Sequence, residues 1–328
     1  MVSRVLVTGA TGFLGGAVLR RLIQAGTPAI GQGRNPVRCA QVREEGLDCI
    51  CWTLPEALPL EAFAALGEVD AIIHCAALSS PFGSRAAFEA ANVRGTQAML
   101  DLARQKGVKR FVFVSSPSIY FALRDQLEVT EDSPLPKPFN AYARSKVRAE
   151  ALVRKAQDVG PIILRPRGLY GPKDTTLLPR LLRAARRRPL PEFRDGRARI
   201  DLTFIEDATS AVCAALAAPN SLEGRAYNIS GGEVVKISEV VEQTCARADV
   251  DVRWRPMPLG PALLAARLAE AAALMYPGQP EPAVTRYGLG LFAFEQSLNL
   301  TRARGELGWE PEVSFAEGLR RTFVRSPA

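Results

Sequence analysis

The sequence predicts an α/β protein with a doubly wound parallel sheet and a smaller C-terminal α+β cap. In the first half, short apolar runs alternate with segments of helical spacing, which is typical of parallel strands joined by helices. The first run, residues 5–8, leads into three glycines and then a helix-like segment. This regularity ends near residue 168. We therefore predict one domain over 1–168, to which 202–230 return, and a cap formed by 169–201 and 231–328.

The glycines between the first strand and the first helix indicate the first ligand. A helix N-terminus offers free N–H groups and the positive end of a dipole to a pyrophosphate, and a Cβ would keep the phosphate away. Glycines with this spacing after a strand predict a dinucleotide site, with an ordinary glycine-rich turn as the alternative. We assign the site to Gly9, Thr11, Gly12, Phe13, Leu14 and Gly15.

Composition narrows the class of protein. The 328 residues are 47% hydrophobic and 23% charged, an ordinary globular balance. Much of the net charge of +8 lies in residues 180–199, which suits an anionic surface, phosphate groups or a solvated helix face. No aromatic residue interleaves with the arginines of 180–188, so nucleic acid is not expected.

Cysteine usage and the first residues predict the compartment. Six scattered cysteines contain no Cys-x-x-Cys pair, and His74 is the only histidine. We therefore expect neither a metal site nor a disulfide framework. Met1 leads directly into the first strand, so we expect no signal peptide and a cytoplasmic protein.

The second and fourth strands carry further cofactor predictions. The second strand, residues 27–33, ends without the acidic residue that usually contacts the adenosine ribose, and Arg34 follows it. An arginine there accommodates a 2′-phosphate, so NADP(H) is favoured, with NAD(H) as the alternative. A third strand is expected over 47–54. The fourth, residues 69–77, ends in Ala76 and Ala77, which leave room for a cofactor.

The later elements follow the same pattern. His74 lies inside the fourth strand, so we predict a buried structural histidine and not a catalyst. A helix is expected to open at Asn92 and run to about Gln105. Residues 109–116 form a fifth strand, and a long helix should run from Asn140 to about Gln157. Strands at 161–166, 203–205 and 226–229 complete the main sheet.

Three polar side chains suit the transfer of a proton to or from a hydroxyl group. Tyr142 and Lys146 are four residues apart and share one face of the predicted helix. A lysine and a positive nicotinamide both favour the phenolate, which should lower the pKa of the tyrosine. Ser116, at a neighbouring strand end, can hold the same substrate oxygen. We predict Tyr142 as acid/base, with Lys146 also holding the nicotinamide ribose.

The cap contains an almost wholly apolar helix over residues 259–276, interrupted by Arg267 and Glu270. It is too short and too charged to predict a membrane span. Three interpretations remain: a buried cap helix, which we favour, a lipid-facing interfacial helix, and a wall of an apolar substrate pocket.

Together these motifs resemble the extended short-chain dehydrogenase/reductase superfamily, with its Rossmann sheet. The matching segments are residues 8–15 (TGATGFLG), 92–96 (NVRGT), 115–116 (SS), 142–146 (YARSK) and 165–172 (RPRGLYGP). Residues 259–276, 281–288 and 300–311 are similar to the 3β-hydroxysteroid dehydrogenase-like branch, which includes 2-alkyl-3-oxoalkanoate reductases.

The resemblance implies roles that the spacing alone does not give. It implies Ser116, Tyr142 and Lys146 as the catalytic triad with Asn92 in support, and Pro166 and Gly168 beside the cofactor. It also implies a small lipophilic substrate and a homodimer formed beside the catalytic helix. The family commonly has Asp-Leu at the end of the third strand, where this sequence has Thr53 and Leu54, so adenine contacts should be looser.

Three functions follow from these features. The leading hypothesis is a dehydrogenase or reductase acting on a bulky apolar alcohol or ketone, with peripheral membrane contact as an option. The second is a nucleotide-sugar epimerase or dehydratase with tightly bound NAD, whose diphosphate would meet residues 180–199. The third is a dinucleotide-sensing protein without catalysis. Such proteins usually lack the Tyr or the Lys, and both are present here.

Overall fold

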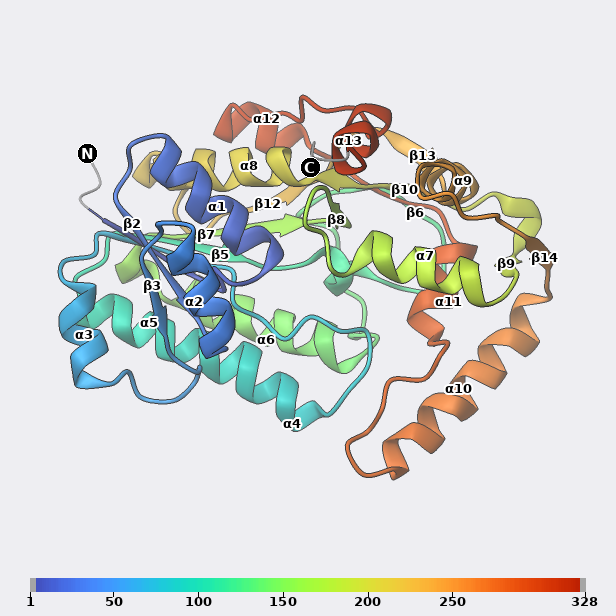
Figure 1. Cartoon of the computed structure of the whole chain (residues 1–328), viewed down its shortest axis with the longest axis horizontal. Helices are drawn as coiled ribbons and strands as arrows, with labels where there is room; N and C mark the ends of the chain where they lie inside the picture. The colour runs from blue at the N-terminus through green and yellow to red at the C-terminus, as the bar shows by residue number, and fades with distance from the viewer. Residues whose placement is uncertain (1–3, 325–328) are drawn as a thin grey trace.

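A computed structural model describes residues 4–324 of the chain (Figure 1). Residues 1–3 and 325–328, including Met1 and the outer ends of both predicted domains, lie outside the described residues. In the described part, seven parallel strands form the main sheet in the order β12-β7-β5-β4-β1-β2-β3. They are β1 (Val5–Thr8), β2 (Ala29–Gly33), β3 (Cys49–Cys51), β4 (Ala71–His74), β5 (Arg110–Val114), β7 (Pro161–Pro166) and β12 (Ala226–Ile229).

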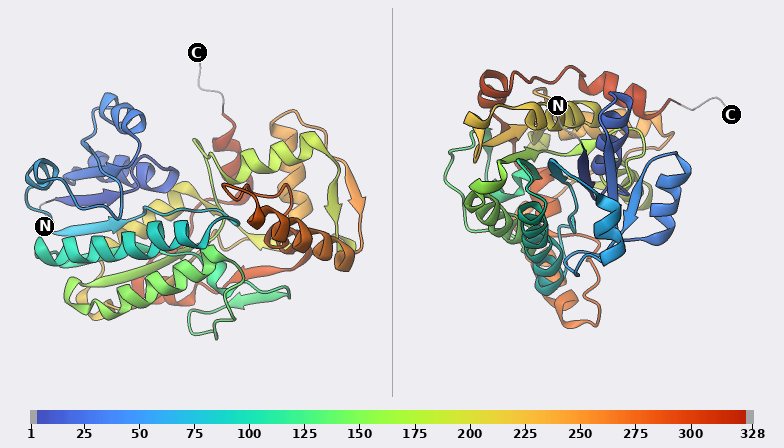
Figure 2. Two further views of the ribbon diagram at one scale, coloured as in Figure 1. Left: turned by 90° about the horizontal axis from the view of Figure 1, so that it is seen from below. Right: turned by 90° about the vertical axis from the view of Figure 1, so that its left-hand side faces the viewer.

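Side chains alternate across this sheet and bury both of its faces. Val5 and Val7 of β1 belong to one apolar core with α1 and α8, whereas Leu6 belongs to a second core with α5 and α6. The two helical layers lie on opposite sides of the sheet (Figures 1 and 2). The helices of this half are α1 (Phe13–Gln24), α2 (Pro36–Glu44), α3 (Leu60–Leu66), α4 (Arg85–Phe88), α5 (Gly95–Gln105), α6 (Ala141–Lys155) and α8 (Ile205–Ala217). The predicted doubly wound α/β fold is thus confirmed.

Five short helical turns occur among the described residues, four of them in this half and η4 in the cap. A π-helical turn, η1 (Glu89–Arg94), joins α4 to α5, and the 3₁₀ turns are η2 (Pro117–Tyr120), η3 (Gln157–Val159), η4 (Arg194–Gly196) and η5 (Asn220–Leu222). The prediction that a helix opens at Asn92 is therefore wrong. The helical path begins at Arg85, because Ser84 caps it by accepting a bond from the Ala87 N–H at 3.5 Å.

One strand prediction is wrong and several were too long. Thr203–Phe204 forms β11, which pairs with β8 (Leu169–Tyr170) in a separate two-stranded sheet. It does not join the main sheet, whereas β12 does so beside β7, as predicted. The second to fifth strands are shorter than the apolar runs, because each run continues into the loop at the sheet edge.

The cap is built from short strands and helices. A four-stranded sheet has the order β13-β10-β15-β6, and β14 pairs with β9. Its strands are β6 (Gln126–Val129), β9 (Leu190–Glu192), β10 (Arg199–Asp201), β13 (Val234–Lys236), β14 (Trp254–Pro256) and β15 (Gln296–Leu298). Its helices are α7 (Leu177–Arg187), α9 (Ile237–Arg247), α10 (Leu259–Met275), α11 (Arg286–Ala293), α12 (Thr301–Leu307) and α13 (Phe315–Thr322). The smaller C-terminal part matches the predicted architecture, while its residue boundaries stay predictions.

Helix α10 corrects the favoured interpretation of the apolar segment. Only Ala266 and Ala273 of this helix are buried, so it is not a buried cap helix. Figure 1 shows it projecting from the body of the cap, with α11 as its neighbour. Across residues 4–324, no helix has both the length and the apolar composition needed to cross a membrane.

Candidate functional site

Two positions at the turn between β1 and α1 are too tightly packed for any residue but glycine. Gly9 has a φ of +67°, and a Cβ there would lie 2.9 Å from Cα of Ala76. A Cβ on Gly15 would lie 2.4 Å from the carbonyl oxygen of Gly9. Helix α1 starts at Gly12 with no side-chain cap and no acidic residue in its first turn. This cradle fits a dinucleotide pyrophosphate, because backbone N–H groups and the helix dipole remain available to an anion.

The structure brings the other predicted cofactor residues to the same edge of the sheet. The chain reverses direction across the sheet at β1, and ligands of such sheets bind at the carboxyl ends of the strands around that point. Each predicted residue follows or ends a strand there: Thr11 after β1, Arg34 after β2, Thr53 and Leu54 after β3, Ala76 and Ala77 after β4, Pro166 and Gly168 at β7. Their contacts with a cofactor stay predictions.

The end of β2 has its own hydrogen-bond pattern. Gln32 is buried, and its Oε1 accepts from the Gly9 N–H at 3.2 Å while its Nε2 donates to the Trp52 carbonyl. The side chain of Gln32 thereby links the glycine turn to the residue that follows β3. Arg34 is exposed one residue beyond the strand. A cation therefore stands where many dinucleotide folds place a carboxylate.

Tyr142 lies in the first turn of α6 and contacts hydroxyl groups from two strand ends. Asn140 starts this helix by accepting a bond from the Ala143 N–H at 2.8 Å. The Tyr142 hydroxyl is hydrogen-bonded with Ser116 and with Ser79. The predicted contact of Ser116 with a substrate oxygen stays a prediction. Burial raises the pKa of Tyr142, and the two serines only partly offset this rise. The expectation of a lowered pKa is wrong here, because burial has the larger effect.

Lys146 is a buried cation one turn further along α6. It is 3% exposed, and its Nζ donates to the Val114 carbonyl at 2.8 Å and lies 4.9 Å from the ring centre of Phe113. Burial lowers the pKa of Lys146 to about 8. The ammonium is thus fixed at the end of β5, the strand that leads directly to Ser116.

Asn92 holds two parts of the site together. Its Nδ2 donates to the Leu78 carbonyl at 3.0 Å and to Ser145 Oγ at 2.9 Å, and its Oδ1 accepts from the Leu78 N–H at 2.7 Å. Ser145 in turn donates to the Tyr142 carbonyl at 2.7 Å. Asn92 lies in the π-helical turn, a feature that is frequent at functional sites. It positions the loop after β4 against α6, while a direct catalytic contact stays a prediction.

His74 is a buried structural histidine, as predicted. It is fully buried, with Nδ1 2.7 Å from Thr8 Oγ1 and Nε2 3.2 Å from Thr96 Oγ1. Burial lowers the pKa of His74 to about 3, so the ring is neutral at ordinary pH. Its contacts tie β1 and β4 to α5 behind the glycine turn.

Two residues at the site were missed from the sequence. Ser79 follows β4 as part of a serine pair, much as Ser115 and Ser116 follow β5, and this parallel could have identified it. Tyr287 on α11 lies close enough to Tyr142 for their charges to interact, which together with burial raises the pKa of Tyr287 to about 12. No local pattern marks Tyr287, because the cap brings it to the site from a distant part of the chain.

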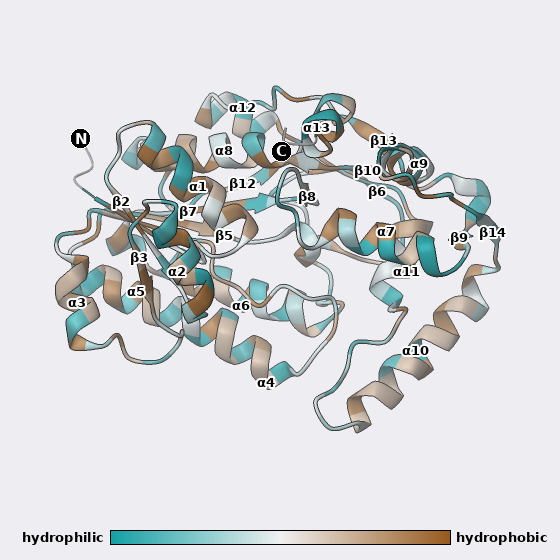
Figure 3. Ribbon diagram, in the orientation of Figure 1, coloured by the Kyte–Doolittle hydropathy of each residue, from teal (hydrophilic) through white to brown (hydrophobic). Residues whose placement is uncertain are grey.

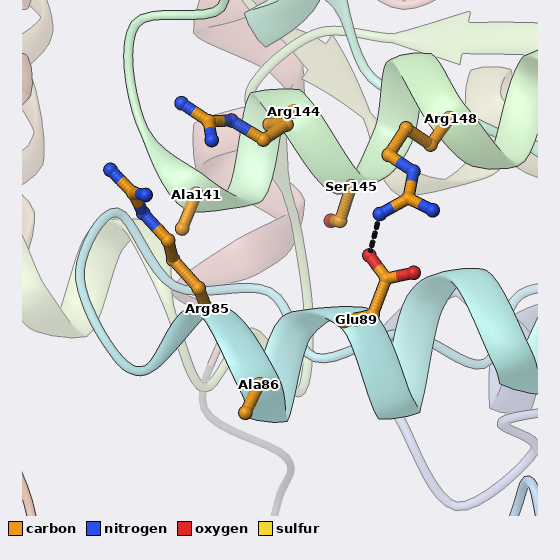
Figure 4. A pocket seen from close by; sticks show the side chains of 7 residues that line it. All are labelled: Arg85, Ala86, Glu89, Ala141, Arg144, Ser145 and Arg148. Carbon is orange, nitrogen blue, oxygen red and sulfur yellow. Dashed lines mark hydrogen bonds and ion pairs between the residues drawn. The ribbon is translucent and has the colours of Figure 1, made fainter.

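A pocket of about 290 Å³ lies between α4 and α6, on the side of α6 that carries Ser145 (Figure 4). Arg85 and Arg144 lie at one end, and at the other Arg148 forms an ion pair with Glu89 at 2.6 Å. None of the predicted cofactor residues lines it. The predicted dimer would form beside this helix, and that prediction is untested.

Comparison with known proteins identifies the family. Residues 5–230 match the NAD dependent epimerase/dehydratase family, and the chain belongs to it. The chain is 33% identical to the uncharacterized protein YbjS of Escherichia coli, over 97% of this chain and 96% of that one. It is 32% identical to a 2-alkyl-3-oxoalkanoate reductase of Stenotrophomonas maltophilia, over 99% and 100%.

A solved structure shows the same fold. UDP-glucuronic acid 4-epimerase from Bacillus cereus in complex with NAD superposes with a TM-score of 0.74 at 22% identity, covering 98% of this chain and 97% of that one. The family and the reductase relative confirm the resemblance to the extended short-chain dehydrogenases. The protein is an oxidoreductase of this superfamily that uses a nicotinamide dinucleotide.

Proposed function

We propose that the protein interconverts a secondary alcohol and a ketone on a bulky apolar substrate, using NADP(H) in preference to NAD(H). The observation that carries this proposal is the Tyr142 hydroxyl, hydrogen-bonded with Ser116 at the carboxyl edge of a dinucleotide-binding sheet. A hydroxyl pair of this kind suits the transfer of one proton at a substrate oxygen.

The residues of this chain divide the chemistry between them. The bound dinucleotide supplies or accepts the hydride. Tyr142 gives the proton to the ketone oxygen in reduction, since its raised pKa keeps the phenol protonated at neutral pH. Ser116 donates a hydrogen bond to the same oxygen and orients it. Lys146, held by the Val114 carbonyl, places a positive charge beside the strand end and binds the nicotinamide ribose.

Aromatic side chains around Tyr142 support an apolar substrate. The rings of Phe121 and Tyr287 have centroids 4.5 Å apart, and those of Phe121 and Phe139 are 4.8 Å apart. Phe88 lies 6.1 Å from the Tyr142 ring. Apolar ligands are bound mainly by hydrophobic and aromatic side chains. The Stenotrophomonas relative is a 2-alkyl-3-oxoalkanoate reductase, which also favours a long-chain 3-oxo acid.

Replacement of the acid/base tests this mechanism. With the best ketone from a panel of 2-alkyl-3-oxo acids and sterol ketones, Tyr142→Phe should lower kcat about 1000-fold, within the usual range for general acid–base catalysis. NADPH binding, measured by fluorescence titration, should change little. Tyr276→Phe removes an exposed hydroxyl from the end of α10 and is the matched control. Full activity of Tyr142→Phe would reject the mechanism.

A cofactor titration tests the preference for NADP(H). Arg34→Ala should weaken NADPH binding about tenfold and leave NADH binding unchanged, because only NADPH carries the 2′-phosphate that a guanidinium pairs with. Arg85→Ala, another exposed arginine, should alter neither. Equal affinities of the wild type for NADPH and NADH would contradict the preference while leaving the reaction class intact.

The nucleotide-sugar alternative would need free basic residues in the cap. Within the described residues, Arg180 forms an ion pair with Glu281, Arg194 with Asp125 at 2.6 Å, and Arg199 with Glu295 at 2.6 Å. These pairs neutralise three of the eight arginines of residues 180–199, while Arg186 and Arg187 at the end of α7 stay unpaired among the described residues. A purified protein whose NAD resists exchange with added NADPH would favour the alternative over our proposal.

A further inference from the structure

Helix α10 exposes large apolar side chains along its outer side. Its buried residues are alanines, Ala266 and Ala273. Leu264, Leu268 and Met275 lie on the opposite side and are 58%, 64% and 88% exposed. Their spacing of four and seven residues places them in one stripe along the helix. Brown and pale tones therefore predominate along this projecting helix in Figure 3.

The exposed charges of residues 253–279 are all positive. Arg253, Arg255 and Arg267 are exposed, and within residues 4–324 none of them forms an ion pair. The only acidic residue between 253 and 279 is Glu270. Its carboxylate is turned inward, where it accepts from Nε and the backbone N–H of Arg286, both at 2.7 Å. The outer surface of the segment is thus apolar and basic.

More arginines adjoin this segment. Strand β14, which leads into α10, pairs with β9, and β9 follows the C-terminal end of α7. That end carries Arg186 and Arg187, both exposed and without an ion pair among the described residues. Arg188 donates to the Ala283 carbonyl in the loop after α10, at 3.1 Å. The basic end of α7 therefore lies beside both connections of α10.

We propose that α10 docks the protein on an anionic lipid bilayer, lying in the interface with Leu264, Leu268 and Met275 buried among the acyl chains. An apolar stripe with arginines beside it is the pattern of interfacial helices. A second copy of the chain fits less well. A symmetric contact through this stripe would bring the arginines of two copies into one interface, and like charges oppose such a contact.

Docking through α10 would also orient the catalytic site. Helix α10 packs against α11, which carries Tyr287 beside Tyr142. The bilayer would then lie on the cap side of the site. This placement suits an apolar substrate delivered from lipid, whereas the docking itself does not depend on the proposed reaction.

Vesicle flotation of the full-length protein tests the docking. Wild type should float with vesicles of equal parts phosphatidylcholine and phosphatidylglycerol, and bind much less to phosphatidylcholine alone. Leu264→Ser/Leu268→Ser/Met275→Ser should lower the partition coefficient about 100-fold, because the apolar stripe is lost. Arg253→Gln/Arg255→Gln/Arg267→Gln should lower it about 100-fold on the anionic vesicles only.

The matched control removes apolar surface elsewhere. Val37 and Leu60 are 67% and 88% exposed on α2 and α3, and Val37→Ser/Leu60→Ser should bind vesicles like wild type. Unchanged NADPH binding and melting temperature in each variant report on folding. Failure of wild type to bind anionic vesicles overturns the proposal, as does equal binding by the stripe variant. A wild-type dimer that the stripe variant abolishes, without vesicle binding, would assign the stripe to a second copy. Loss of vesicle binding with ketone reduction intact would separate docking from the reaction.

Discussion

Helices α6 and α10 have similar lengths, 15 and 17 residues, but place different side chains against the protein. Helix α6 buries Ser145, Lys146 and Glu150 beside its apolar residues. Helix α10 fully buries only two alanines and leaves Leu264, Leu268 and Leu274 exposed. Hydrophobicity alone would have predicted neither the buried charges of α6 nor the exposed leucines of α10. The buried charges of α6 have specific polar partners. Among the described residues, only α11 and the adjoining cap pack against α10.

The inward charge of α6 depends on one partner in the sheet. Arg165 of β7 donates to both carboxylate oxygens of Glu150, at 2.9 and 2.6 Å, and both side chains are almost fully buried. A pair of this kind fixes α6 against β7 and so positions Tyr142 and Lys146. It also makes α6 the more vulnerable of the two helices, because neither charge can be left alone.

The largest expected effect on stability comes from breaking the pair of Glu150 and Arg165. Glu150→Gln should lower the free energy of unfolding by about 3 to 5 kcal/mol, since it leaves the Arg165 charge buried without its partner. Urea unfolding measures the change. Glu89→Gln removes a half-buried carboxylate from the outer pair with Arg148 and should cost at most about 1 kcal/mol. Similar losses for both variants would mean that the inner pair is not desolvated as the structure shows.

Truncation of an apolar side chain should cost more stability in α6 than in α10, although the side chain removed from α10 is larger. Val153→Ala on the buried face of α6 should cost about 2 kcal/mol, from lost transfer free energy and a residual cavity. Leu268→Ala on α10 removes more atoms and should change stability by less than about 0.5 kcal/mol, because the side chain is already in water. Urea unfolding of both variants measures these two losses of stability. A cost above about 1 kcal/mol for Leu268→Ala would show that α10 is covered in solution.

The smallest expected effect is the contribution of the buried Lys146 to the pH dependence of stability. The pKa of Lys146 is about 8 in the fold and 10.5 unfolded, so between these values the unfolded chain binds more protons. This contribution to stability rises by about 1 kcal/mol from pH 8 to pH 9. Burial raises the pKa of Cys39, Cys75 and other thiols, which acts in the opposite direction.

The measurement is therefore the stability of wild type minus that of Lys146→Met at each pH. This difference should increase between pH 8 and 9, and Arg267→Met on α10 should show no such trend. A flat difference for Lys146→Met would place the ammonium in contact with solvent.

Local patterns were enough wherever the backbone itself makes the site. The glycine turn, the helix that starts at Asn140 and the pair Tyr142 and Lys146 depend on spacing over a few residues, and the structure places them as the sequence predicts. Prediction failed where pairing depends on distant segments. Thr203–Phe204 has strand character but pairs with β8, and the helical path through Asn92 starts earlier, at the Ser84 cap.

The sequence by itself determined the doubly wound fold, the dinucleotide turn, the residue types of the proposed acid/base site and the burial of His74. Periodicity and turn chemistry depend on neighbouring residues, so they can be recognised in the sequence. Only the tertiary structure decided that Tyr287 reaches Tyr142, that burial raises the pKa of Tyr142, and that α10 faces outward. These outcomes depend on solvent exclusion and charge contacts between segments far apart in sequence, and no local spacing encodes them.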